Sequence, residues 1–180
     1  DCHCTHGVLA RQDSKSPTFP KHVPTLCAEC HQSGASAAKR IGEERHRVDE
    51  YVMSIHGKGL LESGLIVTAE CTDCHTAHDV RPTNDPKSSV HPDNISHTCG
   101  VCHNGIYEEF EKGIHSPLVS ESDEKLPSCN DCHYSHAITR ADKADFSLTV
   151  RQQCGDCHED VTETYFETVH GKASELGGVG

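Results

Sequence analysis

The chain has 180 residues and a formal charge of −12, aromatic residues make up only 4%, and tryptophan is absent. With a mean hydropathy of −0.59, it has little apolar surface to offset the conformational entropy lost on folding. The negative charge argues against a nucleic-acid-binding protein, because phosphate backbones need a basic surface. It fits solubility or docking to a basic partner, and no apolar run is long enough to span a membrane.

The chain is poor in apolar residues but contains twelve cysteines and sixteen histidines. Both counts are far above ordinary usage. In chain order, five complete C-x-x-C-H motifs occupy residues 27–31, 71–75, 99–103, 129–133 and 154–158. The opening "DCH" aligns with the end of "CTDCH" at residues 71–75. We therefore expect a sixth motif, entered part-way at Cys2 and His3, in a segment of a longer chain.

C-x-x-C-H is the attachment signature of c-type haem. On a helical turn, positions i, i+3 and i+4 share a face, so two thiols can reach the haem vinyl groups while the histidine reaches the iron. Zinc knuckles and disulfides are the alternatives, but neither needs the histidine. Six chance histidines after the second cysteine have a probability of roughly one in a million at this composition.

The sequence thus predicts about six covalently attached haems c. The predicted thioether cysteines are Cys2, Cys27, Cys30, Cys71, Cys74, Cys99, Cys102, Cys129, Cys132, Cys154 and Cys157. The predicted proximal iron ligands are His3, His31, His75, His103, His133 and His158.

The motifs belong to a repeat that occurs three times, over residues 1–60, 61–118 and 119–180. Each two-haem unit reads C-x-x-C-H-x-x-H, linker, plain C-x-x-C-H, amphipathic helix, closing histidine. Apolar residues spaced by four predict helices over residues 106–114 and 161–169. Gly57 and Gly171 are expected at helix ends, the turn-rich linkers are expected to be irregular loops, and no strand pattern is convincing.

Six further histidines recur in register with the units, and we predict them as distal iron ligands. They are His6, His56, His78, His115, His136 and His170. A histidine three residues after a motif lies on the same side of that haem, and a closing histidine lies about 18 Å along a helix from its own motif. Each should therefore serve another haem.

We expect a sequential assignment of these ligands. It pairs His6 with the haem of Cys27–Cys30, His56 with the next haem and His78 with the one after that, leaving His170 for a haem beyond residue 180. The residues without a counterpart in other units have no assigned role: Cys4, His22, His46, His91 and His97. Axial ligation, a propionate partner and a plain loop position stay open for these histidines, and Cys4 is expected to be a spare thiol near haem.

With motif, repeat and H-G helix ends in view, the chain resembles the multihaem c-type cytochromes of bacteria and archaea. The resemblance implies a mainly irregular fold with short α-helices, little or no β-sheet, and a stacked haem chain as core. It implies a periplasmic or extracellular (secreted) electron conduit without catalytic residues, with redox partner proteins or extracellular acceptors, in some members polymerised into filaments. The alternatives are the electron-relay part of a nitrite, hydroxylamine or tetrathionate reductase or oxidoreductase with an open catalytic haem, and a zinc module.

Overall fold

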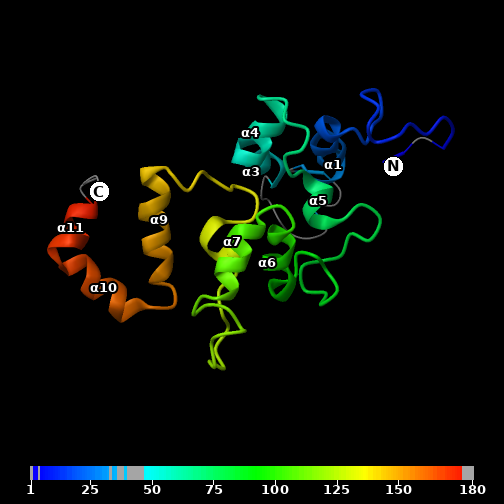
Figure 1. The fold of residues 1–180 in the computed structure, drawn as a ribbon. Helices are drawn as coiled ribbons and strands as arrows, with labels where there is room; N and C mark the ends of the chain where they lie inside the picture. Colours follow the sequence, from blue (N-terminus) through cyan, green and yellow to red (C-terminus); the bar gives the residue numbers. More distant parts are fainter. Residues whose placement is uncertain (1, 4, 33, 36–38, 40–46, 176–180) are drawn as a thin grey trace.

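The computed structural model describes the chain except residues 1, 4, 33, 36–38, 40–46 and 176–180, so that Cys4 and His46 lie outside the described residues. The described part is built from short helices joined by loops, with no β-strand, as the sequence predicts. The elements are η1 (Pro20–His22), α1 (Val23–His31), α3 (Arg47–Met53), α4 (Ile55–Leu61), α5 (Cys71–His75), α6 (Pro92–Gly100), α7 (Asn104–Glu111), α8 (Cys129–His133), α9 (Ala144–Cys154), α10 (Glu159–Glu167) and α11 (Val169–Glu175). They follow one another along an elongated molecule, with α1 toward one end and α11 at the other (Figure 1). None of the described helices has the length and apolar character needed to cross a membrane.

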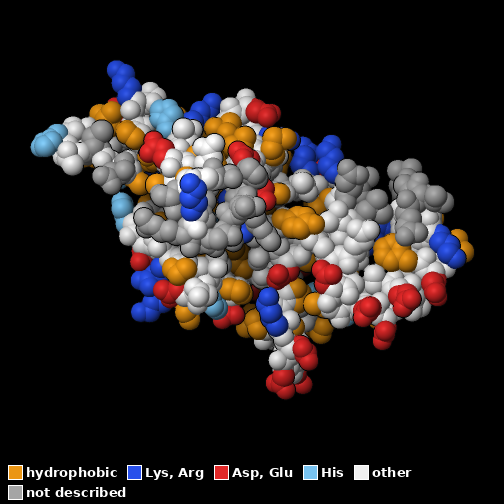
Figure 2. Space-filling view, turned by 180° about the vertical axis from the view of Figure 1, so that it is seen from behind, with side chains coloured by type: hydrophobic (Ala, Val, Ile, Leu, Met, Phe, Trp, Pro, Cys, Tyr) orange, Lys and Arg blue, Asp and Glu red, His pale blue; other side chains and the backbone are white. Residues whose placement is uncertain are grey.

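The polypeptide builds almost no hydrophobic core of its own. Among the described residues, the buried hydrophobic side chains are Val23 and Leu60. Hydrophobic side chains are instead spread over the surface (Figure 2). The accessible surface is 12719 Å², whereas a compact protein of this mass exposes roughly 8,600 Å². The chain therefore buries less of its own surface than a globular domain of its size.

The two complete C-x-x-C-H-x-x-H motifs form helices that span the five motif residues, α5 and α8. Each starts with a capping box, in which the third helical residue, Asp73 or Asp131, accepts a hydrogen bond from the backbone N–H of the N-cap residue. Each ends in the same backbone reversal, with Thr76 at φ 63° and Tyr134 at φ 62°. A side chain other than glycine rarely adopts this conformation. Its recurrence indicates that the turn after the motif histidine is under constraint.

The plain motifs have a different local structure. In α1 the motif lies wholly inside the helix, which ends at His31. In the later units the motif histidine sits at a corner between two helices, as the N-cap of α7 for His103 and of α10 for His158. Their N–H groups donate to the carbonyls of Cys99 and Cys154, at 3.0 and 2.8 Å. The helix that precedes each plain motif begins within the linker, so the linkers are more helical than predicted.

The closing histidines His56 and His170 lie at the start of a helix, which corrects the prediction that the following glycine ends one. The helix is interrupted at Ser54, between α3 and α4. The Ser54 hydroxyl caps α4 by accepting a hydrogen bond from the Gly57 N–H at 3.0 Å. A Cβ on Gly57 would lie 2.1 Å from the Tyr51 carbonyl oxygen, and Gly171 has the same 2.1 Å approach to Tyr165. Glycine is needed here because two helices cross closely, not because the backbone turns left-handed.

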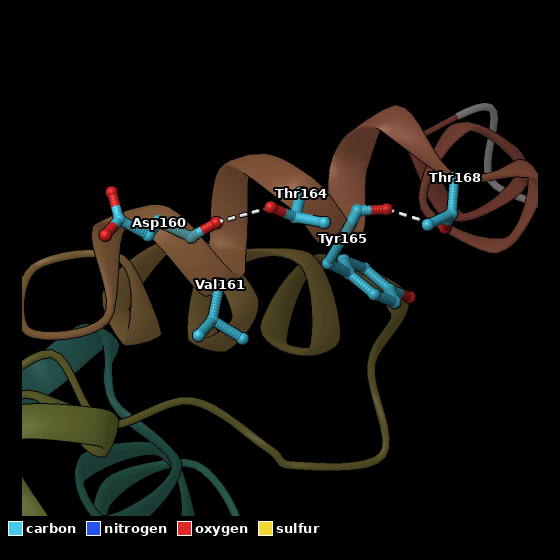
Figure 3. A pocket seen from close by; sticks show the side chains of 5 residues that line it. All are labelled: Asp160, Val161, Thr164, Tyr165 and Thr168. Atoms are coloured by element: carbon cyan, nitrogen blue, oxygen red, sulfur yellow. Dashed lines mark hydrogen bonds between the residues drawn. The ribbon is translucent and has the colours of Figure 1, made fainter.

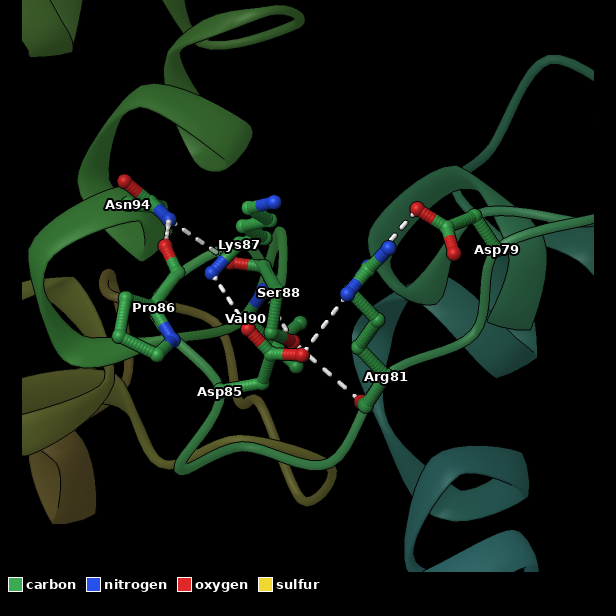
Figure 4. A network of polar contacts seen from close by, with 8 residues as sticks. All are labelled: Asp79, Arg81, Asp85, Pro86, Lys87, Ser88, Val90 and Asn94. Atoms are coloured by element: carbon green, nitrogen blue, oxygen red, sulfur yellow. Dashed lines mark hydrogen bonds and ion pairs between the residues drawn. The ribbon is translucent and has the colours of Figure 1, made fainter.

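The linker between the two motifs of a unit is ordered by polar contacts (Figure 4). Arg81 binds Asp79 at 2.8 Å and Asp85 at 2.9 Å, while the buried Ser88 hydroxyl donates to the Arg81 carbonyl at 3.3 Å. In the first unit the buried Ser16 donates to the Leu9 carbonyl in the same way, at 3.4 Å. The sequence motif D-x-K-S occurs at residues 13–16 and again at 85–88, so the same local structure forms in both linkers.

Candidate functional site

Four pairs of histidine rings recur through the structure, and each joins a motif histidine to a predicted distal histidine. The pairs and their ring-centroid separations are His3–His78 at 6.2 Å, His56–His103 at 6.0 Å, His75–His136 at 6.0 Å and His115–His158 at 6.1 Å. The partners are 43 to 75 residues apart in the sequence. The fold therefore brings together the two classes of histidine that the repeat pattern separates.

The separation suits two imidazoles on opposite sides of one metal ion. Two metal–nitrogen bonds of about 2 Å each, plus the two ring half-widths of about 1 Å, give about 6 Å between the centroids. The ring planes differ by between 8° and 34°. The narrow range of the four distances indicates one type of site, repeated.

The neighbours differ from the sequential assignment expected from sequence. His56 lies beside His103 rather than beside the Cys71–Cys74 motif, and His78 lies beside His3 rather than beside the Cys99–Cys102 motif. In all four pairs the two histidines come from different repeat units, so each predicted distal histidine lies beside a motif other than its own, as expected from sequence. The physical reason for the different order is that the units interleave instead of stacking as closed blocks.

Burial lowers the pKa of three predicted iron ligands, His56, His75 and His133. It lowers the pKa of His56, and the charge of nearby His103 lowers it further. Burial likewise lowers the pKa of His75, with a smaller contribution from His31, and the pKa of His133, with one from His103. A metal ligand must be a neutral imidazole, so these shifts favour ligation at neutral pH.

Cysteines from successive motifs lie against each other. A hydrogen bond joins Cys27 to Cys71, lowering the pKa of Cys27 and raising that of Cys71. The same contact in the next unit joins Cys99 to Cys129, raising the pKa of Cys99 and lowering that of Cys129 to about 6. In each pair the two thiols are thus joined by a hydrogen bond. The described cysteines are free, without a disulfide.

The remaining motif contacts continue the series. Burial raises the pKa of Cys74 and of Cys132, with smaller contributions from the charges of Cys102 and Cys154 respectively. Together with the two hydrogen-bonded pairs, these interactions link the second motif to the third, the third to the fourth, and so on to the sixth. The order of the motifs in space therefore follows their order in the sequence.

Four predicted ligands lie outside the four ring pairs: His6, His31, His133 and His170. His6 contacts the Thr5 hydroxyl at 3.2 Å, and the ring of His133 stacks on Phe146 with centroids 4.9 Å apart. These four histidines belong to the first and last units of the chain.

The three described histidines without an assigned role have local contacts. His22 Nδ1 lies 2.8 Å from the Ser16 carbonyl, His91 caps α6, and His97 lies 6.1 Å from Tyr107 between ring centroids. None of them lies in a histidine pair.

Two features near the motifs were missed from the sequence. The side chain of Glu70, the N-cap of α5, is fully buried and accepts a 2.8 Å hydrogen bond from Arg11 of the first unit. Phe146, eight residues before Cys154, supports His133. An acidic residue directly before the C-x-x-C-H motif could have signalled the first, since helix N-termini favour carboxylates. No sequence signal indicates the second.

In the part of the chain that the structure describes, no group of three or more histidine, cysteine, aspartate or glutamate side chains is gathered as for a metal ion. The histidine sites are pairs. Comparison with protein-family models, with curated proteins and with solved structures gives no match to this chain.

Proposed function

We propose that the protein is a multihaem c-type cytochrome that moves electrons along closely spaced bis-histidine haems, as a periplasmic or extracellular conduit. The observation that carries the proposal is the set of four histidine pairs with centroids 6.0–6.2 Å apart. Each pair combines a motif histidine, which directly follows a predicted thioether cysteine, with a histidine from a different unit. This combination is what a covalently attached haem with two axial histidines requires.

The residues present fit haem c. In α5 and α8 both cysteines and the histidine of the motif lie within one short helix, where positions i, i+3 and i+4 share a face. The cysteines would hold the haem through thioether bonds, and the paired histidines would fill both axial positions. Haem would supply an iron that changes oxidation state by one electron. An iron bound by both histidines of a pair would have no place for a substrate, so the four pairs favour electron transfer over catalysis.

The motif contacts support a continuous route. Cys27 meets Cys71 and Cys99 meets Cys129 across the unit boundaries and linkers, so the attachment points of successive sites are neighbours. The chain's part in this function is to hold the sites in sequence order, and to set burial and axial ligation, which tune the potential.

The exposed apolar side chains support haem as the missing interior. Ile106 is 71% exposed, Ile114 69%, Val161 70% and Val169 81%. They lie on the amphipathic segments between a plain motif and its closing histidine. Haem faces would cover such side chains, and the hydrophobic contribution of roughly 25 cal/mol per Å² buried would then come from protein against porphyrin.

The test is a haem count by pyridine haemochrome together with the optical spectrum of the ferric protein. We expect about six haems per chain and a spectrum dominated by low-spin iron. A colourless protein that binds zinc, or one with mostly high-spin iron, would refute the proposal.

A second candidate is the electron-relay part of a multihaem reductase or oxidoreductase. The observation in its favour is His133, which stacks on Phe146 and lies outside the described histidine pairs. An iron held there by His133 alone would have an open position. A high-spin band that shifts on adding nitrite or cyanide, together with nitrite or hydroxylamine turnover, would favour the enzyme.

A further inference from the structure

The four histidine pairs obey one rule, which steps by one repeat unit. The motif histidine of a C-x-x-C-H-x-x-H segment pairs with the x-x-H histidine of the following unit, in His3–His78 and again in His75–His136. The histidine of a plain motif pairs with the closing histidine of the preceding unit, in two pairs: His103 with His56, and His158 with His115. Each kind of pair occurs twice, so the rule does not rest on one contact.

The same rule identifies the four remaining predicted ligands as halves of pairs with neighbouring units. In the last unit, His133 would pair with the x-x-H histidine of a following unit, and His170 would pair with the plain-motif histidine of that following unit. At the first unit, His6 is an x-x-H histidine and His31 is a plain-motif histidine. The first and last units are thus complementary: the first carries the two kinds of histidine, His6 and His31, with which His133 and His170 of the last unit would pair.

The surface of α10 gives a second, independent indication. In the first unit, Tyr51 lies five residues before its closing histidine and donates its hydroxyl to the carbonyl of Ala69 at 3.0 Å. Ala69 belongs to the following unit, two residues before Cys71. The Tyr51 side chain on α3 therefore contacts the residues that lead into the first motif of the next unit.

The equivalent residue in the last unit is Tyr165, five residues before His170. It lines a cavity of about 420 Å³ together with Asp160, Val161, Thr164 and Thr168. Val161 and Tyr165 point to the same side of α10 (Figure 3), and Val161 is 70% exposed. In the third repeat the Tyr165 hydroxyl accepts a 3.3 Å hydrogen bond from Arg151 of its own unit instead, and the neighbouring Val161 stays exposed.

We propose that this end of the molecule binds another unit of the same repeat, with its C-x-x-C-H-x-x-H segment on the Tyr165 face, its x-x-H histidine paired with His133 and its plain-motif histidine paired with His170. The proposal rests on the proposed function, because the histidine pairs need iron. It extends that function by naming the partner that continues the electron route: a two-haem unit of the same kind.

The experiment uses the haem-loaded protein and the double variant His6→Ala/His170→Ala, which removes the donated ligand from both pairs between neighbouring units. The exposed His97 is the matched control, as His97→Ala. Spin state and molecular mass are followed over a hundredfold range of protein concentration by optical spectroscopy and sedimentation. A second copy of the chain is the probe, because its first unit carries His6 and His31.

We expect the wild type and His97→Ala to lose high-spin iron as concentration and mass rise. The double variant should keep two high-spin haems per chain at every concentration, and so exceed the wild type by two where the wild type is associated. Low-spin iron at single-chain mass, with two haems opened by the double variant, would place the partner unit on the same polypeptide and supports the pairing. A double variant with the spin state of the wild type would overturn it, and the haem count and low-spin spectrum would still stand for the proposed function.

Discussion

Removing the His56 imidazole should open a haem that is distant in sequence. His56→Ala deletes one ring of the pair that lies 6.0 Å from His103. Alanine is a good helix former, and His56 sits in α4 beside the Gly57 contact that the substitution leaves unchanged. We expect the fold to persist and one of the six expected haems, about one-sixth of the iron, to become high-spin. Exogenous imidazole should restore the low-spin spectrum.

The identity of the opened haem separates the structural pairing from the sequential assignment. In a Cys99→Ala/Cys102→Ala background, which lacks the haem of His103, His56→Ala should add no high-spin iron. In a Cys71→Ala/Cys74→Ala background it should add the same amount as in the wild type. Optical and electron paramagnetic resonance spectra of the ferric proteins measure both, with His97→Ala as the control. The reverse pattern would show that His56 serves the Cys71–Cys74 haem and would refute the pairing.

Three further predictions concern stability, measured by guanidinium denaturation of the haem-loaded protein. Gly57→Ala should lower the free energy of unfolding by about 2 kcal/mol or more, because its Cβ would meet the Tyr51 carbonyl at 2.1 Å. The control Gly105→Ala, inside α7 with no atom within 4 Å, should raise it by about 0.5 kcal/mol. Equal effects would contradict the crossing-helix explanation. Thr76→Gly should stabilise by about 1 kcal/mol by relieving the strain at φ 63°, and a loss of stability would show that the threonine side chain is needed. Arg11→Ala should cost about 1.5 kcal/mol, because it leaves the buried Glu70 carboxylate without its 2.8 Å partner; adding Glu70→Gln should recover part of the loss, and no recovery would argue against the ion pair.

The linkers and helix ends mark where local sequence rules fell short. Turn-forming residues predicted loops between the motifs, yet α6 begins at Pro92 and α9 at Ala144. Proline is well tolerated in the first turn of α6, and the two helices run only into the start of the plain motif, ending at Gly100 and Cys154. Gly57 was predicted as a helix end by its position alone. Its role, a 2.1 Å approach between helices, depends on a crossing that no local pattern encodes.

The sequence alone determined the motif positions, the three-unit repeat, and the two classes of recurring histidine. These depend on short spacings in the sequence, and residues three and four positions apart lie on one face of a helical turn. It also predicted a fold of short helices without a sheet, since too few apolar residues are present for a conventional core. Only the tertiary structure decided which histidine lies beside which, as in His56 with His103. Such pairs form between residues 43 to 75 positions apart, and their choice depends on how the units interleave, which the periodicity within one unit does not determine.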